Sequence, residues 1–169
     1  MRLVSNVTQA MKWLSTGLLF SAAAVSAKQV EVHDPVMAKE GDTYYVFSTG
    51  PGITYYESKD LTNWKLTGRV FKDEPSWAKR ISPSFDGHLW APDVYEKNGK
   101  FYLYYSVSAF GKNTSAIGVT VNETLDPASP DYKWIDYGIV VESVPERDDW
   151  NAIDPAIIVD DKGTPWMSF

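Results

Sequence analysis

The sequence predicts an all-β protein built from the four-stranded blades of a β-propeller. Three segments repeat one plan, in which an aspartate near a proline precedes a few apolar residues, a glycine-containing turn and an aromatic-rich strand. Their aspartates, Asp34, Asp93 and Asp154, lie 59 and 61 residues apart. A period of this size is typical of radial or stacked repeats, and no convincing amphipathic helix pattern interrupts it.

Turn residues and alternating aromatic residues place the strands of the first two repeats. Glu-Gly-Asp at residues 40–42 and Asn98-Gly99 are strong hairpin signals between such runs. In the first repeat we expect a strand after Asp34-Pro35, then strands over 43–48, 52–58 and 66–71. In the second we expect strands over 91–95, 101–106, 115–120 and 134–141. Four antiparallel strands per repeat make one propeller blade.

The third repeat supplies only a strand over 154–158, a turn over 161–163 and a strand starting near residue 165. The chain therefore holds about two blades and the start of a third. Because a propeller needs at least four blades to close, we expect residues 28–169 to be the N-terminal part of a longer domain. Loops over 73–88 and 142–150 are long enough to form a binding face.

Residues 1–27 resemble a secretory signal peptide. Arg2 and Lys12 give a positive start, an apolar stretch follows from Trp13, and Val25-Ser26-Ala27 offers a small-residue cleavage site. The alternative is a membrane anchor, but about 13 apolar residues fall short of the roughly 20 that span a bilayer. We expect a secreted protein, extracellular or periplasmic, with no membrane partner.

The charge and residue composition disfavour several kinds of partner and site. The chain has 16 basic and 22 acidic residues. No Lys/Arg cluster supplies the basic face that nucleic-acid binding needs, so we expect no nucleic-acid partner. The absence of cysteine removes disulfides and thiolate metal sites. A neutral polysaccharide is compatible with this composition.

Asp34 and Asp154 are the candidate catalytic carboxylates. Both precede a proline at the start of an innermost strand, so in a propeller both would face the central channel. Paired carboxylates are the machinery of glycoside hydrolysis, in which an inverting enzyme uses one as a base on water and another as an acid. The alternative is that Asp-Pro only marks a strand start, since both residues favour turns.

Several other residues are candidates for contacting a sugar. Trp90 and Phe110 lie where strands meet loops on the same proposed face, and Gly111 would let a ligand approach the backbone. Ordinary packing is the competing interpretation of each ring. Asn151 could donate to sugar hydroxyls or cap a turn. His33 is more plausible as a structural histidine than as a metal ligand.

Five stretches of the chain together resemble glycoside hydrolase family 43, specifically its endo-1,5-α-L-arabinanases. They are residues 32–36 (VHDPV), 44–50 (YYVFSTG), 87–93 (GHLWAPD), 104–108 (YYSVS) and 151–156 (NAIDPA). The resemblance covers residue 31 to the end. It implies a five-bladed propeller that hydrolyses α-1,5-L-arabinofuranosyl linkages in arabinan, a side chain of pectin, with inversion and as a monomer.

The resemblance also implies roles for individual residues. Asp34 would be the general base and Asp154 the modulator of the acid's pKa. Trp90, Phe110, Gly111 and Asn151 would line the sugar subsites together with both aspartates, and Ser168 and Phe169 would begin a further substrate-contacting stretch.

The family's general acid, a glutamate, and a histidine that holds a structural calcium ion fall outside these 169 residues. We therefore assign no acid, no metal ligand and no cofactor here, and expect these residues alone to be inactive. Two alternatives stay open. One is another family activity such as a xylosidase or arabinofuranosidase, and the other is a sugar-binding propeller without catalysis.

Overall fold

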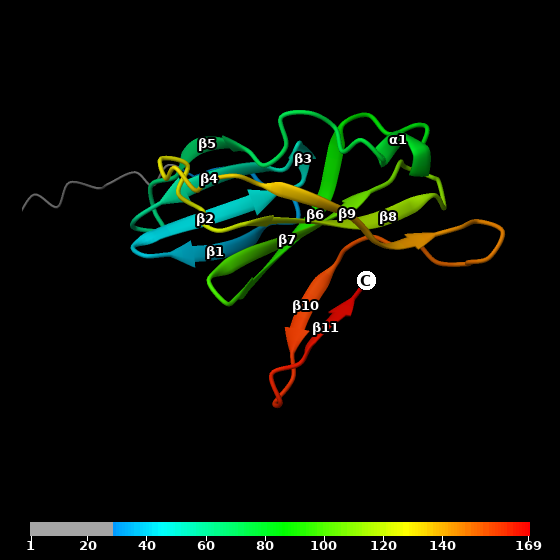
Figure 1. Ribbon diagram of the computed structural model, residues 1–169. Helices are drawn as coiled ribbons and strands as arrows, with labels where there is room; N and C mark the ends of the chain where they lie inside the picture. Colours follow the sequence, from blue (N-terminus) through cyan, green and yellow to red (C-terminus); the bar gives the residue numbers. More distant parts are fainter. Residues whose placement is uncertain (1–28) are drawn as a thin grey trace, which may run out of the picture.

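The computed structural model describes residues 29–169, and the signal peptide expected over residues 1–27 lies outside them. Regular structure in this range is almost entirely strand, with one short helix, α1 (Ala78–Ile81). Two large antiparallel sheets lie side by side, and a third hairpin projects from them (Figure 1). No helix in this range is long and apolar enough to cross a membrane.

The first sheet, blade 1, has the order β1-β2-β4-β5. Its strands are β1 (Val36–Glu40), β2 (Thr43–Ser48), β4 (Thr54–Ser58) and β5 (Lys65–Arg69). Glu40 pairs with Thr43 across a two-residue loop, and the loop glycine, Gly41, has a φ of 55°. The four strands predicted for the first repeat are confirmed.

The second sheet contains blade 2, with the order β6-β7-β8-β9. These strands are β6 (His88–Lys97), β7 (Lys100–Val107), β8 (Ser115–Asn122) and β9 (Ile135–Ser143). Asn98 and Gly99 both have positive φ, as a type I′ hairpin requires. The two-residue strand β3 (Gly50–Pro51) leaves blade 1 and pairs with the start of β6.

The third repeat forms the hairpin of β10 (Ala156–Val159) and β11 (Pro165–Ser168). The carboxylate of Asp160 orders its turn by accepting hydrogen bonds from the backbone N–H groups of Lys162 and Thr164. The prediction of an all-β propeller architecture, with two blades and the start of a third, is confirmed.

Each of the three repeats begins with a left-handed residue followed by proline. These residues are Asp34, Ala91 and Asp154, with φ of 46°, 40° and 57°. Asp34 lies six residues before the end of β1, as Ala91 lies six residues before the end of β6. The predicted equivalence of Asp93 with Asp34 and Asp154 is therefore wrong. Ala91 occupies that position, and β6 carries an irregularity between Trp90 and Asp93.

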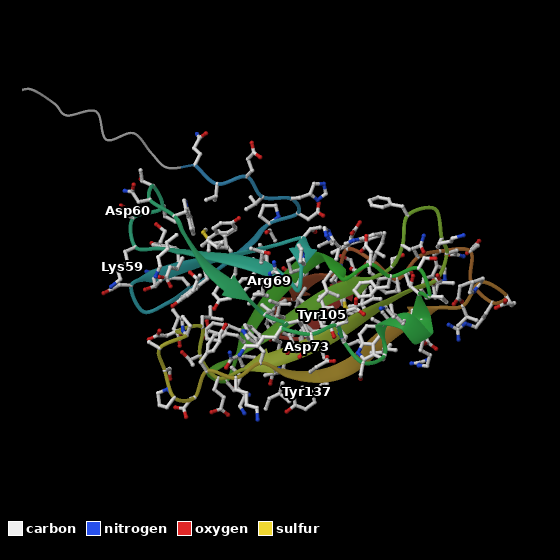
Figure 2. All side chains as sticks on the ribbon, turned by 90° about the horizontal axis from the view of Figure 1, so that it is seen from above. Lys59, Asp60, Arg69, Asp73, Tyr105 and Tyr137 are labelled. Atoms are coloured by element: carbon white, nitrogen blue, oxygen red, sulfur yellow. The ribbon has the colours of Figure 1, made fainter. Side chains whose placement is uncertain are left out.

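Aromatic residues join the two blades in one core. The ring of Phe47 in blade 1 packs edge-on against Trp134, with centroids 6.0 Å apart, and Phe71 packs edge-on against Tyr105 at 4.8 Å. The hydroxyls of Tyr55 and Tyr132 are 2.7 Å apart. Tyr105 is fully buried and lies among the side chains at the centre of the molecule, whereas Lys59 and Asp60 lie at its margin (Figure 2).

The segment over 73–88 covers blade 2 and is not a free loop. Its helix α1 buries Ala78 completely, and Phe85 is also buried. The indole of Trp77 stacks on Tyr105 with centroids 5.9 Å apart and donates a hydrogen bond to Asp136. The expectation that this loop builds a binding face is therefore wrong for Trp77, Ala78 and Phe85, because they are committed to packing.

Replacing Gly118 by alanine should destabilise the fold. A Cβ at this position would lie 2.7 Å from ring atoms of both Trp77 and Tyr105, and overpacking of this kind costs about 1–3 kcal/mol. Chemical denaturation of the full-length gene product measures the loss. Gly68→Ala is the matched control, because its Cβ would meet the ring of Tyr55 at an ordinary 3.4 Å. Equal losses in the two variants would contradict this account.

The buried tyrosines should make the fold sensitive to alkali. Burial, followed by the charges of Asp126 and Glu40, raises the pKa of Tyr45 from 10.0 to about 12, and burial raises the pKa of Tyr55 and Tyr105 further. Each of these tyrosines has a higher pKa in the folded protein than in the unfolded protein. Its contribution to the free energy of unfolding is therefore fully present below pH 10 and is lost as the pH rises toward 12. Denaturation midpoints across that interval should fall, and a constant midpoint would disprove the coupling.

Candidate functional site

Asp34 presents one anchored and one open carboxylate oxygen. Its Oδ2 accepts hydrogen bonds from Nδ1 of His33 at 2.6 Å and from Oγ1 of Thr49 at 2.8 Å. Its Oδ1 accepts no hydrogen bond from residues 29–169, and 41% of the side chain is exposed. An ionised carboxylate held in this way has a free acceptor for a water molecule.

Thr49 links Asp34 to the next blade. Besides donating to Asp34, its hydroxyl accepts a hydrogen bond from the backbone N–H of Ala91 at 2.7 Å. Thr49 was not among the predicted site residues, although it stands six residues after Thr43, the first residue beyond the hairpin loop of blade 1. That regular spacing is the signal that could have identified it.

Asp154 is held by the equivalent residue of blade 2. Ser106 stands six residues after Lys100, as Thr49 stands six residues after Thr43, and its hydroxyl accepts a hydrogen bond from the N–H of Asp154 at 3.0 Å. Ser106 also pairs with Trp90 in the sheet. Asp34 and Asp154 are both exposed, and a hydroxyl holds the carboxylate of the first and the backbone N–H of the second.

Two aromatic rings lie next to these hydroxyl contacts, because Trp90 directly precedes Ala91 and pairs with Ser106. Trp90, half-buried at the start of β6, contacts Phe110 with ring centroids 4.9 Å apart, and Phe110 is 92% exposed. Gly111 follows with a φ of 70°, and a Cβ there would meet nothing within 4 Å. The structure therefore brings Trp90, Phe110 and Gly111 together, with an almost fully solvated ring at the edge.

Three predicted residues remain: Asn151, just before Asp154 in the chain, and Ser168 and Phe169, at the end of the hairpin of β10 and β11. The Oδ1 of Asn151 accepts a hydrogen bond from Ser115, so its amide N–H₂ group is the end available to a ligand. Ser168 pairs with Ala156 across the third hairpin. Phe169 lies edge-on to Trp150 with centroids 5.4 Å apart. Trp150 was not among the predicted site residues, because nothing in its local sequence marks it.

The arrangement suits proton transfer to Asp34 and binding of a flat ligand against exposed rings. Within residues 29–169, no three histidine, aspartate or glutamate side chains converge in a way that could hold a metal ion. We derive no chemical step through a metal.

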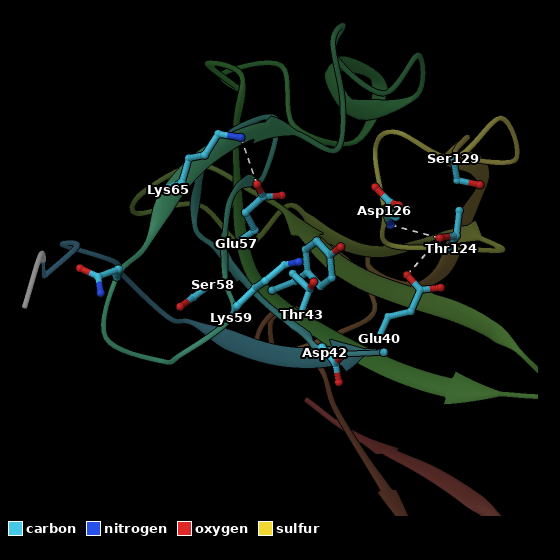
Figure 3. A pocket seen from close by; sticks show the side chains of 13 residues that line it. Glu40, Asp42, Thr43, Glu57, Ser58, Lys59, Lys65, Thr124, Asp126 and Ser129 are labelled. Atoms are coloured by element: carbon cyan, nitrogen blue, oxygen red, sulfur yellow. Dashed lines mark hydrogen bonds and ion pairs between the residues drawn. The ribbon is translucent and has the colours of Figure 1, made fainter.

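A hollow that contains none of the predicted site residues lies at the opposite end of blade 1. It has a volume of about 710 Å³, and Glu40, Glu57, Lys65, Thr124 and Asp126 are among the residues that line it (Figure 3). Lys65 forms an ion pair with Glu57 at 3.1 Å, so two of its charges satisfy each other. A smaller hollow of about 390 Å³ borders His33 and Thr49. We place the candidate site at the aspartates and not at either hollow. The exposed Asp34 carboxylate has an open oxygen that can accept a proton, whereas the volume of a hollow indicates no reaction.

Comparison with known proteins identifies close relatives of the chain. The model of the family "Glycosyl hydrolases family 43" matches residues 27–169. The extracellular exo-α-(1→5)-L-arabinofuranosidase of Cellvibrio japonicus is 72% identical over 158 residues, covering 93% of this chain and 46% of the relative. The extracellular endo-α-(1→5)-L-arabinanase 1 of Bacillus subtilis is 37% identical over 166 residues, covering 92% and 50%.

Solved structures agree with the architecture. The α-L-arabinanase of Cellvibrio cellulosa superposes with a TM-score of 0.82 at 75% identity, covering 83% of this chain and 45% of that one. The same protein has been solved in complex with arabinohexaose. Arabinanase Arb43A of Bacillus subtilis superposes with a TM-score of 0.77 at 38% identity, covering 85% and 49%. The chain spans about half the length of these relatives.

Proposed function

The chain belongs to glycosyl hydrolase family 43, and on that premise we propose that this protein hydrolyses α-1,5-linked L-arabinofuranosyl bonds of arabinan with inversion. The observation that carries the proposal is the exposed Asp34 carboxylate, which has one anchored oxygen and one open oxygen. The names of the relatives support the sugar, because those with exo and endo activity both act on the same α-(1→5) linkage.

In the proposed reaction, Asp34 acts as the general base. Its open Oδ1 takes a proton from a water molecule while the water oxygen forms a bond to the anomeric carbon. The glycosidic bond breaks on the opposite face, and its electron pair leaves with the departing sugar oxygen, which takes up a proton. We assign that proton donor to no residue of this chain. Asp154 would be the charged neighbour that modulates the pKa of the donor.

Sugar binding is proposed for the aromatic rings and polar ends around the aspartates. Trp90 and Phe110 offer apolar faces, and the open space beside Gly111 admits a ligand close to the backbone. Asn151 has a free amide end, and Ser168 and Phe169 extend the surface along the third hairpin. The partner of this surface would be arabinan itself. Two relatives named as extracellular support export of this protein.

We propose exo attack as the first expectation for the mode of cleavage and endo attack as the second. The sequence resemblance implied an endo enzyme, but the relative at 72% identity is named an exo enzyme and the endo enzyme of Bacillus subtilis is 37% identical. Greater identity argues for a shared subsite shape.

Asp34→Asn in the full-length gene product should abolish turnover while preserving binding. The amide keeps the shape of the carboxylate but cannot accept the water's proton, so kcat should fall by about 10²–10⁴-fold or more. Hydrolysis of linear arabinan gives the rate, and calorimetry with an arabino-oligosaccharide gives the affinity. Asp131→Asn, an exposed aspartate between β8 and β9, is the control. Unchanged turnover in Asp34→Asn would favour a sugar-binding propeller without catalysis.

The product pattern should distinguish the two modes of attack. An exo enzyme releases one short product from the chain end from the first minutes, because its groove is closed on one side. An endo enzyme produces a ladder of oligosaccharides, because its groove is open at both ends. Chromatography of early time points on linear arabinan makes this measurement, and an early ladder would overturn the exo assignment while leaving the hydrolase proposal intact.

A further inference from the structure

We propose that Thr49 is a positioning residue for the catalytic base, because its hydroxyl fixes the Asp34 carboxylate to the backbone of blade 2. The inference deepens the proposed function and rests on it. Thr49 contacts Oδ2 of Asp34, the carboxylate oxygen that the attacking water does not use. As a consequence, the Thr49 hydroxyl sets the orientation of the open oxygen, Oδ1.

The direction of the two hydrogen bonds follows from the donors available. The N–H of Ala91 can only donate, so the Thr49 oxygen accepts that hydrogen bond at 2.7 Å. A threonine hydroxyl has a single proton, which is left for Oδ2 of Asp34 at 2.8 Å. An ionised carboxylate is a pure acceptor, so the pair is matched to the charged form that a base requires.

Thr49 is better suited than His33 to hold the carboxylate. The His33 side chain is 79% exposed, and it neighbours Asp34 in the chain, so it moves with the same local backbone. Thr49 is half-buried, is restricted in χ1 by its branched Cβ, and is tied to blade 2. Ala91, whose N–H it binds, is the residue after Trp90. Thr49 therefore fixes the proposed base relative to the backbone that carries the proposed sugar-binding ring.

Blade 2 repeats this hydroxyl contact without the carboxylate. Ser106, the equivalent of Thr49, accepts the N–H of Asp154, and among the described residues its hydroxyl is bonded to no aspartate side chain. Thr49 and Ser106 therefore share one structural role, which is to bind the N–H of the left-handed residue that begins the following repeat. The contact with Asp34 is the additional feature of Thr49, and the experiment must separate the two roles.

Thr124 provides a matched control. Its hydroxyl also donates to a carboxylate, Oε2 of Glu40 at 3.0 Å, and accepts a backbone N–H, that of Asp126 at 3.1 Å. Glu40 keeps a second donor, the N–H of Leu125, as Asp34 keeps His33. This contact also joins blades 1 and 2, but it lies at the other end of β1, in the hollow drawn in Figure 3.

The test compares Thr49→Val, Thr49→Ser and Thr124→Val in the full-length gene product acting on linear arabinan. Small displacements of a reacting group cost up to about 10²-fold, so Thr49→Val should lower kcat by about 10–100-fold with KM within about threefold. Thr49→Ser keeps the hydroxyl and should restore kcat to within about threefold. Thr124→Val should lower Tm by a few degrees, on the order of 2–4 °C, and leave kcat unchanged.

A crystal structure of Thr49→Val supplies a measurement that does not need turnover, and the Asp34 carboxylate should adopt a different rotamer there. The inference is overturned if that carboxylate is unmoved and kcat stays within about twofold. It is also overturned if Thr124→Val loses as much kcat as Thr49→Val. If the wild-type protein hydrolyses no arabinan, the proposed function fails, and the Asp34 rotamer still decides whether Thr49 positions this carboxylate.

Discussion

The structure depends on holding one residue at the start of each blade in the left-handed conformation. Residues other than glycine adopt positive φ at a cost of about 1–3 kcal/mol, and here each is followed by proline, which fixes its own φ and has no N–H to donate. Hydrogen bonds offset this cost, because the N–H groups of Ala91 and Asp154 bond to hydroxyls of the preceding blade. The same constraint exposes the side chains of Asp34 and Asp154 at the site.

Hydrogen bonds and aromatic contacts join the blades beside the candidate site. At the interface between blades 1 and 2, the Thr49 hydroxyl joins Asp34 to the Ala91 N–H near one end, and the Thr124 hydroxyl donates to Glu40 near the other. Aromatic contacts fill the middle, including Phe47 on Trp134. The hairpin of β10 and β11 joins blade 2 through a further carboxylate, because Asp93 accepts a hydrogen bond from the N–H of Ile157 at 2.6 Å. Through Thr49, the Asp34 carboxylate is tied to the backbone of blade 2.

Local signals in the sequence were sufficient to predict the strands but not the contacts between blades. Gly41 and Asn98-Gly99 mark their hairpins because the turns need positive φ, and alternating aromatic residues mark the flanking strands. The equivalence of Asp93 with Asp34 failed because Asp34 precedes its proline whereas Asp93 follows Pro92, so the residue in register with Asp34 is Ala91. Thr49 was missed because its partner, Ala91, lies 42 residues away; the spacing from the hairpin marks the position of Thr49 but does not encode that contact.

We propose that Asp34 activates water for a single direct displacement at the anomeric carbon. The most direct test is to follow the anomeric proton by nuclear magnetic resonance during the first minutes of arabinan hydrolysis by the full-length gene product. An α-linked substrate should first release the β-anomer of the sugar, which then equilibrates. First release of the α-anomer would mean that a carboxylate attacks the sugar itself, and would contradict the role assigned to Asp34.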